Sequence, residues 1–191
     1  MAKKQIKQKA KKSIKKNFFE VKAPLTSTKI YLYSPSKEDL EGKTIKLDLT
    51  KTLRGKSLEL KLRIKQSEEK LNASPESIQL TGSYVRRVMR KGTDYAEDSF
   101  RTECRDSLVE IKPFMITRRR VSRAILKALR ENAKKHLATH IKTRDAEEIF
   151  SEIISNKLQK QLALRLKKIY PLALCEIRMF KVVRKKENSK K

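Results

Sequence analysis

The sequence has few of the residues from which catalytic loops and disulfide frameworks are built. Its 191 residues include four glycines, two cysteines and no tryptophan. No Gly-rich phosphate loop, nucleophile elbow or zinc-protease signature is present, and four glycines leave little material for such loops. Because no set of convergent catalytic groups is indicated, we expect a protein that is not an enzyme and that binds no cofactor.

Long apolar runs and paired cysteines are also missing. No segment approaches the roughly 18 apolar residues needed to span a bilayer, and the N-terminus lacks the apolar core of a secretory signal. Cys104 and Cys175 belong to no Cys-x-x-Cys pair, so we expect reduced, buried thiols in a cytoplasmic protein. Aromatic residues, at 6%, form no base-stacking pattern along one strand.

Positive charge is what the sequence has in excess. Lysine and arginine number 49 against 22 acidic residues, which gives a net charge of +27. Residues 1–16 contribute +8 and residues 184–191 contribute +4, leaving +15 for residues 17–183. The excess therefore belongs to the folded body as well as to its ends, which indicates a polyanionic partner.

Composition and periodicity divide the chain into an arm, a body and a tail. We expect residues 1–16 to be a disordered basic arm, residues 17–183 to form a single α+β RNA-binding domain, and residues 184–191 to be a basic tail. Within the body, residues 17–115 are predicted to be mainly β, residues 117–169 to form two helices, and residues 172–183 to form a closing strand. The predicted fold is an antiparallel, barrel-like β-sheet packed with long helices, with extended basic ends.

Alternation of apolar and polar residues supports the β prediction. Residues 58–64 place leucine or isoleucine at every second position, with charged residues between them. This period of two is typical of a strand buried on one face. A turn at residues 54–56 makes a hairpin with the alternating residues 45–50 before it.

A long basic helix is the strongest candidate for a binding surface. Residues 117–140 are predicted to form an amphipathic helix with Thr117 as its N-cap and with its cations opposite its apolar face. At about 1.5 Å per residue these cations stand roughly 5–6 Å apart, which suits a line of phosphates. A solvated face is the alternative interpretation, although Glu131 is the only acid between Arg118 and Lys135. The stripe consists of Arg123, Lys127, Arg130 and Lys134.

Further cations complete the predicted RNA-binding set. An arginine triplet at the expected helix start predicts an anion lying across the free amides there. A second basic cluster is expected on a short helix between strands, where a solvated helix end is an equally good interpretation. The triplet is Arg118, Arg119 and Arg120; the cluster is Arg86, Arg87, Arg90 and Lys91; the ends add Lys11, Lys12, Lys15, Lys16, Lys185 and Lys186.

His136 and His140 are the residues that most resemble a metal pair. They lie four residues apart on the predicted helix and could share an ion. No third ligand is suggested by spacing, so we expect no metal site and place both histidines near the helix C-terminus, where positive charge is favourable.

Several short motifs resemble one ribosomal protein family. Residues 18–24, FFEVKAP, follow a lysine-rich arm, and residues 169–172, IYPL, precede the predicted closing strand. In this order, with residues 80–91 and the basic helix between them, they resemble the archaeal and eukaryotic S3Ae family of small-subunit ribosomal proteins. Phe18 stands where the family usually has tryptophan, and residues 95–97 lack the family's Asp-Gly-Tyr turn. The chain ends soon after the closing strand, as in archaeal members.

The resemblance implies a structural constituent of the small ribosomal subunit. Its partners would be small-subunit ribosomal RNA on the platform near the mRNA exit and neighbouring platform proteins, with mRNA at the exit as a further candidate. We expect phosphate contacts, no membrane partner and no homo-oligomer. The alternatives are a free-standing RNA-binding or RNA-chaperone protein and, less compatible with a charged body, a peripheral membrane protein.

Overall fold

The structure is a computed structural model that describes residues 15–26, 29–53, 55–67 and 70–185. Its elements are β1 (Asn17–Lys22), β2 (Ile30–Ser34), η1 (Glu38–Leu40), β3 (Thr44–Asp48), β4 (Leu58–Ser67), β5 (Lys70–Leu80), α1 (Gly82–Val88), β6 (Tyr95–Glu97), β7 (Phe100–Glu103), β8 (Ser107–Thr117), α2 (Arg123–Lys142), α3 (Ala146–Ile154), α4 (Lys157–Leu166) and β9 (Leu172–Lys185). The α+β prediction is confirmed.

Within these described residues, the strands form one nine-stranded sheet. Its main path runs β2-β1-β5-β9-β8-β6, with β3 and β4 branching from β5 and β7 pairing with β8. Neighbours pair antiparallel except β1 and β5, which are parallel at Val21↔Leu71. The sheet is not closed, so the barrel-like prediction is not confirmed. The predicted hairpin of β3 and β4 is present.

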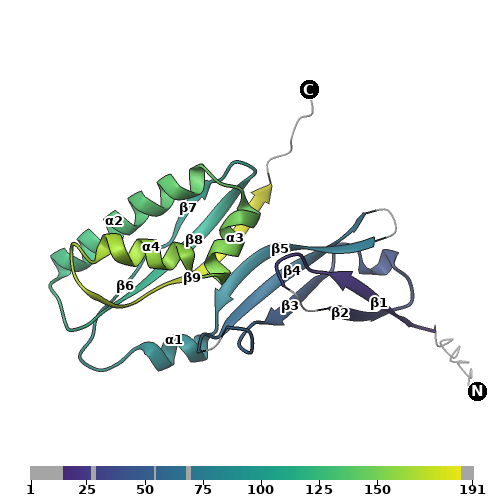
Figure 1. Ribbon diagram of the computed structural model, residues 1–191, viewed down its shortest axis with the longest axis horizontal. Helices are drawn as coiled ribbons and strands as arrows, with labels where there is room; N and C mark the ends of the chain where they lie inside the picture. The colour runs from purple at the N-terminus through teal and green to yellow at the C-terminus, as the bar shows by residue number, and fades with distance from the viewer. Residues whose placement is uncertain (1–14, 27–28, 54, 68–69, 186–191) are drawn as a thin grey trace, which may run out of the picture.

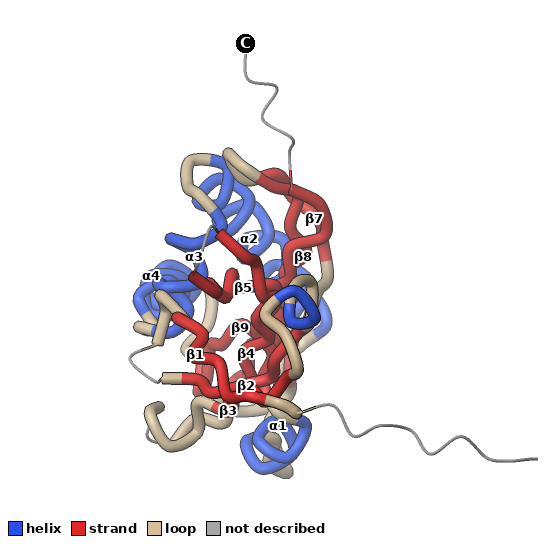
Figure 2. The backbone as a smooth tube through the Cα atoms, turned by 90° about the vertical axis from the view of Figure 1, so that its right-hand side faces the viewer, coloured by secondary structure: helices blue, strands red, loops and turns tan. Residues whose placement is uncertain are grey.

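Helices cover one half of the sheet. Figure 1 shows α2, α3 and α4 lying over β6 to β9, whereas β1 to β5 form the other half of an elongated molecule. Figure 2, turned by 90°, shows β1, β2 and β3 close together at one end, with α1 at the edge. Long strands β5 and β9 pair at Ser77↔Lys181 to Gln79↔Met179 and so join the two halves.

The period-two pattern of residues 58–64 marks a strand with one buried face. In β4, the side chains of Leu58, Leu60, Leu62 and Ile64 are all at most 1% exposed. Since successive strand residues point to opposite faces, Glu59 and Arg63 between them are exposed. The predicted alternation is therefore confirmed, and it fixes which face of this half meets the core.

The helical region contains three helices rather than the two predicted over residues 117–169. The expected second helix is interrupted at Asn156, which adopts a left-handed backbone with φ 59° and separates α3 from α4. Asparagine tolerates this conformation better than most residues. Across the break the apolar stripe persists, since Ile149, Ile153, Leu158 and Leu162 are all buried.

The start of the long helix also differs from the prediction. Thr117 is the last residue of β8 and is completely buried, and α2 begins only at Arg123, after Ser122. β8 extends because its pairing with β9 continues as far as Thr117↔Leu172. At the other end of that pairing, β9 reaches Lys185, two residues beyond the predicted closing strand.

Candidate nucleic-acid interface

The predicted cationic stripe lies on the exposed surface of α2. Its four members, Arg123, Lys127, Arg130 and Lys134, are all exposed and fall within a sector of roughly 60° at 3.6 residues per turn. The buried face of α2 consists of Leu129, Ala133, Leu137 and Ile141.

That stripe borders the buried face instead of opposing it. The predicted apolar face included Val121, Ala124 and Leu129, but of these only Leu129 is buried: Ala124 is exposed and Val121 precedes the helix. Lys134 shows the geometry directly, because its Nζ lies 5.7 Å from the ring centroid of Phe100 on β7. The cations therefore run along the side of α2 that meets the sheet, not along its outermost ridge.

A cationic groove lies where the stripe meets β7. This hollow of about 630 Å³ is lined by residues 100–105, which form β7 and the turn after it, and by Lys134, Ala138 and Lys142 of α2. Arg101, Arg105 and Lys142 were missing from the predicted site. Arg101 is exposed on β7, whose Phe100 and Thr102 are buried, so its signal was the alternation along the strand. Arg105 is exposed in the turn that follows β7.

Arg118, Arg119 and Arg120 occupy the connection between β8 and α2, and all three are exposed. The anion site predicted across a helix start has no such geometry, because the triplet precedes the helix. An intramolecular network orders the connection. The Thr117 hydroxyl donates to the carbonyl of Arg119 at 2.7 Å, with the carbonyl of Asp94 at 2.9 Å as its alternative acceptor, and Val121 N donates to Asp94 Oδ2 at 2.9 Å.

The second predicted cluster lies only in part on the expected short helix, because Arg86 and Arg87 are in α1 whereas Arg90 and Lys91 follow its end. Thr81 caps this helix by accepting from Tyr84 N at 3.4 Å. Arg86, Arg87, Arg90 and Lys91 are exposed, with the Arg87 guanidinium 5.4 Å from the Tyr84 ring centroid. Arg87 and Arg90 also line a hollow of about 530 Å³ against the ends of β8 and β9.

The chain that follows α1 links Arg90 to the neighbourhood of the arginine triplet. Thr93 Oγ1 donates to the carbonyl of Arg90 at 2.8 Å, and the next residue, Asp94, is the partner of Thr117, which directly precedes Arg118. The pairing of Tyr95 with Ile116 fixes the same neighbourhood. Arg118 in turn lines a hollow of about 420 Å³ with Lys160 of α4 and with Lys167, which directly follows that helix.

The basic ends are described only in part. Lys15 and Lys16 are exposed immediately before β1, whereas Lys11, Lys12 and Lys186 lie outside the described residues. Lys185 is the last residue of β9 and belongs to a strand, not to a tail as predicted.

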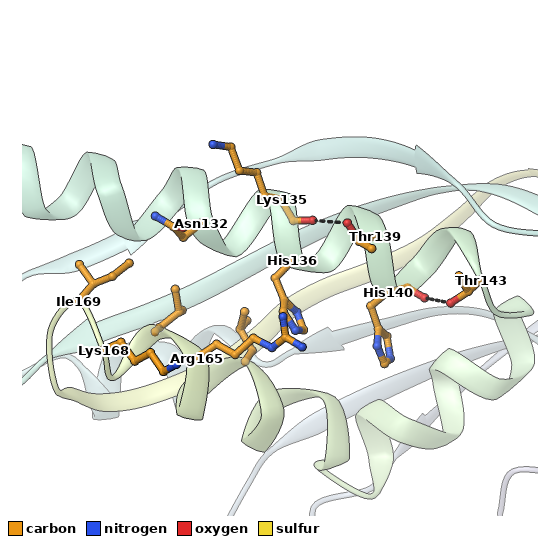
Figure 3. Close-up of a pocket in the computed structure, with 11 residues that line it drawn as sticks. Asn132, Lys135, His136, Thr139, His140, Thr143, Arg165, Lys168 and Ile169 are labelled. Carbon is orange, nitrogen blue, oxygen red and sulfur yellow. Dashed lines mark hydrogen bonds between the residues drawn. The ribbon is translucent and has the colours of Figure 1, made fainter.

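The two histidines face α4 on the other flank of α2. Figure 3 shows His136 beside Arg165, and a hollow of about 610 Å³ lies between the two helices. The His136 and His140 rings stack with centroids 6.2 Å apart, and His140 Nε2 lies 2.7 Å from Glu152 Oε2. Burial is the main cause that lowers the pKa of His136, and the positive charge of Arg165 is the next. Burial also lowers the pKa of His140, followed in size by the positive charge of Arg144.

Uncharged histidines would suit metal coordination, but the surroundings do not supply further ligands. In the part of the chain that the structure describes, no three His, Cys, Asp or Glu residues are grouped so that they could hold a metal ion. Glu152, the nearest carboxylate to His140, also pairs with Arg144. Over those same residues, no helix is both long and apolar enough to cross a membrane.

The exposed cations of the α2 stripe, the arginine triplet and the α1 cluster can contact phosphates. Arginines present planar forks of donors that match phosphate oxygens, and lysines act as compact point charges. The groove beside β7 and the hollows at Arg90 and Arg118 are open and rimmed by these groups. This arrangement favours binding along a charged backbone over recognition of one small anion.

Comparison with known proteins places this chain in a ribosomal family. The sequence model of the Ribosomal S3Ae family matches residues 3–186. A protein of Methanothermobacter thermautotrophicus is 31% identical over 100 residues, covering 52% of this chain and 51% of its own length. One of Nanoarchaeum equitans is 31% identical over 106 residues, covering 55% and 54%, and one of Pyrobaculum neutrophilum is 27% identical over 139 residues, covering 72% and 63%.

All three relatives are named small ribosomal subunit protein eS1. The chain spans about half the length of the first two of them. Because the family match extends over nearly the whole sequence, from the lysine-rich start through β9, this chain belongs to the Ribosomal S3Ae family.

Proposed function

We propose that this chain is a structural, non-catalytic constituent of the small ribosomal subunit that binds ribosomal RNA through phosphate contacts. The relatives' names support the ribosomal role. The observation that carries the RNA-binding role is the row of four exposed cations on α2 beside a cationic groove. Its position is the platform near the mRNA exit, among neighbouring platform proteins and close to mRNA, in the cytoplasm.

Charge neutralisation is the physical role of these residues. RNA helices that approach each other in a subunit repel through their phosphates, and a row of Arg and Lys between them screens that repulsion. Arg118, Arg119 and Arg120 precede this row on the connection to β8, and the α1 cluster is linked to that connection through Asp94 and Tyr95. These groups extend the surface along which an RNA backbone can be bound.

Charge reversal on α2 tests the proposal. We expect the triple substitution Arg123→Glu, Lys127→Glu and Arg130→Glu to abolish co-sedimentation with the small subunit in a cell lysate. All three side chains are exposed, so the isolated chain keeps its fold, as circular dichroism would show.

A matched control has the same change of net charge elsewhere. Lys43→Glu, Lys46→Glu and Lys51→Glu alter three exposed lysines on and around β3. This control is expected to remain with the subunit at moderate salt. Normal incorporation of the α2 variant would contradict the assigned surface, and a slow-sedimenting wild-type pool at every salt concentration would favour a free-standing RNA-binding protein.

A further inference from the structure

Three exposed aromatic side chains lie together on the outer face of β1 and β2. Phe18 is 72% exposed, and Tyr31 and Tyr33 are each 58% exposed. Phe18 pairs with Tyr33 and Glu20 pairs with Tyr31 across the two antiparallel strands, so all of these side chains share one face. Tyr31 and Tyr33 alternate along β2, but Phe18 joins them only through the pairing of β1 with β2, so the sequence showed no more than a pair.

Burial of the opposite face shows that these rings are not needed for the core. Val21, Ile30 and Ser34 are buried, and Phe19 and Leu32 are partly buried against the core. Single exposed apolar residues are common on protein surfaces, whereas a contiguous aromatic group marks an interaction site. Here the centroids of Phe18 and Tyr33 are 4.9 Å apart, and their ring planes are tilted by 39°.

Positive charge surrounds the rings. Lys16 Nζ lies 5.6 Å from the Tyr33 ring centroid, and Lys22 is exposed on the same face of β1. The acid on this face, Glu20, is offset by Lys29 at 3.8 Å. Eight lysines precede β1 within residues 1–16. Charge complementarity therefore favours an anionic polymer with flat apolar groups over an apolar protein surface.

We propose that the outer face of β1 and β2 stacks unpaired nucleobases of single-stranded RNA on Phe18, Tyr31 and Tyr33, with Lys16 and Lys22 contacting the flanking phosphates. Aromatic side chains on neighbouring strands are one means by which sheets hold splayed bases. Tyr31 and Tyr33 are separated by two residues of one strand, about 7 Å, so they receive different bases.

This inference rests on RNA being the polyanion, as in the proposed function, but it concerns a different surface. Figure 1 shows β1 and β2 at the opposite end of the elongated molecule from the start of α2. Phosphate contacts at α2 are independent of base identity and base presence, whereas stacking requires the base itself. A ligand without bases therefore separates the two.

The test compares the full-length chain on a short oligouridine and on an abasic oligonucleotide with the same number of phosphates. We expect wild type to bind the oligouridine at least about 5-fold more tightly, the lower end of what one stacked base contributes. The variant Phe18→Ala/Tyr33→Ala is expected to bind both ligands with the weaker, equal affinity. Tyr95→Ala removes an aromatic residue that is 55% exposed on β6 and keeps the difference.

A spectroscopic readout makes the test independent of affinity. The chain contains no tryptophan, so Phe18→Trp places a single indole in the proposed platform. Its fluorescence is expected to be quenched by the oligouridine and not by the abasic ligand, because quenching requires ring contact.

The outcomes separate the two proposals. Equal wild-type affinity for the two ligands would overturn the stacking proposal and leave phosphate binding intact, whereas failure to bind either would contradict RNA binding itself. Wild-type RNA discrimination in the double alanine variant would also overturn it. If that variant in addition leaves the small subunit, the rings contact a neighbouring protein.

Discussion

At the scale of single residues, a buried ion pair connects the two halves of the molecule. Lys56, in the turn before β4, is 6% exposed and contacts Glu176 of β9, which is 9% exposed. Its Nζ also donates to Asn156 Oδ1 at 2.9 Å, at the left-handed break between α3 and α4. Although the chain has a net charge of +27, this lysine is buried and stabilises the fold, so it is not available to a partner.

Removing one partner of this pair should be strongly destabilising. We expect Lys56→Ala to lower the free energy of unfolding by about 3–5 kcal/mol, because Glu176 would stay buried without its partner. Urea unfolding followed by circular dichroism measures the change. Lys127→Ala, which breaks the exposed pair with Glu131, is the control and should change stability by less than about 1 kcal/mol. Equal effects would mean that the buried pair has no special role.

The two histidines predict how stability depends on pH. Burial and neighbouring arginines lower the pKa of His136 and His140 in the folded state, so the unfolded chain takes up protons first as the pH falls. The contribution of the two histidines to the free energy of unfolding is therefore fully present above about pH 6.5 and is lost as the pH decreases below it. The melting temperature is expected to fall between about pH 7 and pH 5.5, and to fall less in His136→Gln/His140→Gln. A rise in this range would contradict the direction of both shifts.

At the scale of elements, hydrogen bonds at the end of β8 decide where α2 begins. Ser122 precedes the helix, but its side chain makes no capping hydrogen bond. The connection is instead held by Thr117 and Asp94, whose backbone N also donates to Thr117 Oγ1 at 3.1 Å. The arginine triplet is thus displayed on a short connection that a buried hydroxyl anchors.

Thr117 and Ser122 should therefore contribute unequally to stability, because only the Thr117 hydroxyl is hydrogen-bonded in the connection. Thr117→Val should cost roughly 0.5–1.5 kcal/mol of stability, because the Asp94 N–H and the Arg119 carbonyl lose their part-buried hydrogen bonds to the Thr117 hydroxyl. Ser122→Ala should cost less than about 0.5 kcal/mol, since no capping bond is lost. Chemical denaturation of both variants checks the ranking. The reverse order would show that Ser122 caps the helix.

At the scale of the whole molecule, the charge distribution opposes the folded state in isolation. The body has a net charge of +15 compacted into one sheet and its helices, and folding brings these cations closer together. Under the proposed function, binding of RNA would relieve this repulsion and so stabilise the fold.

Salt should therefore stabilise the free protein. We expect the melting temperature to rise as monovalent salt increases from about 10 mM to about 150 mM, because the screening length falls from about 30 Å to about 8 Å. Affinity for RNA should fall steeply over the same range as counterion release weakens. A melting temperature that decreases with added salt would show that ion pairs, not net repulsion, dominate.

The sequence by itself determined the class of fold and gave the reason to propose a polyanionic partner. Alternation at residues 58–64 specified a strand and its buried face, because side-chain period is a local property of the backbone. Exposure of Arg123, Lys127, Arg130 and Lys134 followed from their shared helical face, and the polyanionic partner followed from charge alone. Local sequence also predicted the short helix that contains Arg86 and Arg87, although it ends before Arg90.

Only the tertiary structure decided which distant residues meet and where the elements end. Thr117 resembles a helix cap in sequence, but long-range pairing of β8 with β9 draws it into the sheet. Lys56 contacts Asn156, 100 residues later in the chain, and Glu176, 120 residues later. The aromatic face of β1 and β2 depends on the register in which the two strands pair. Such contacts arise from packing and hydrogen bonding across the fold, which a pattern within one segment does not contain.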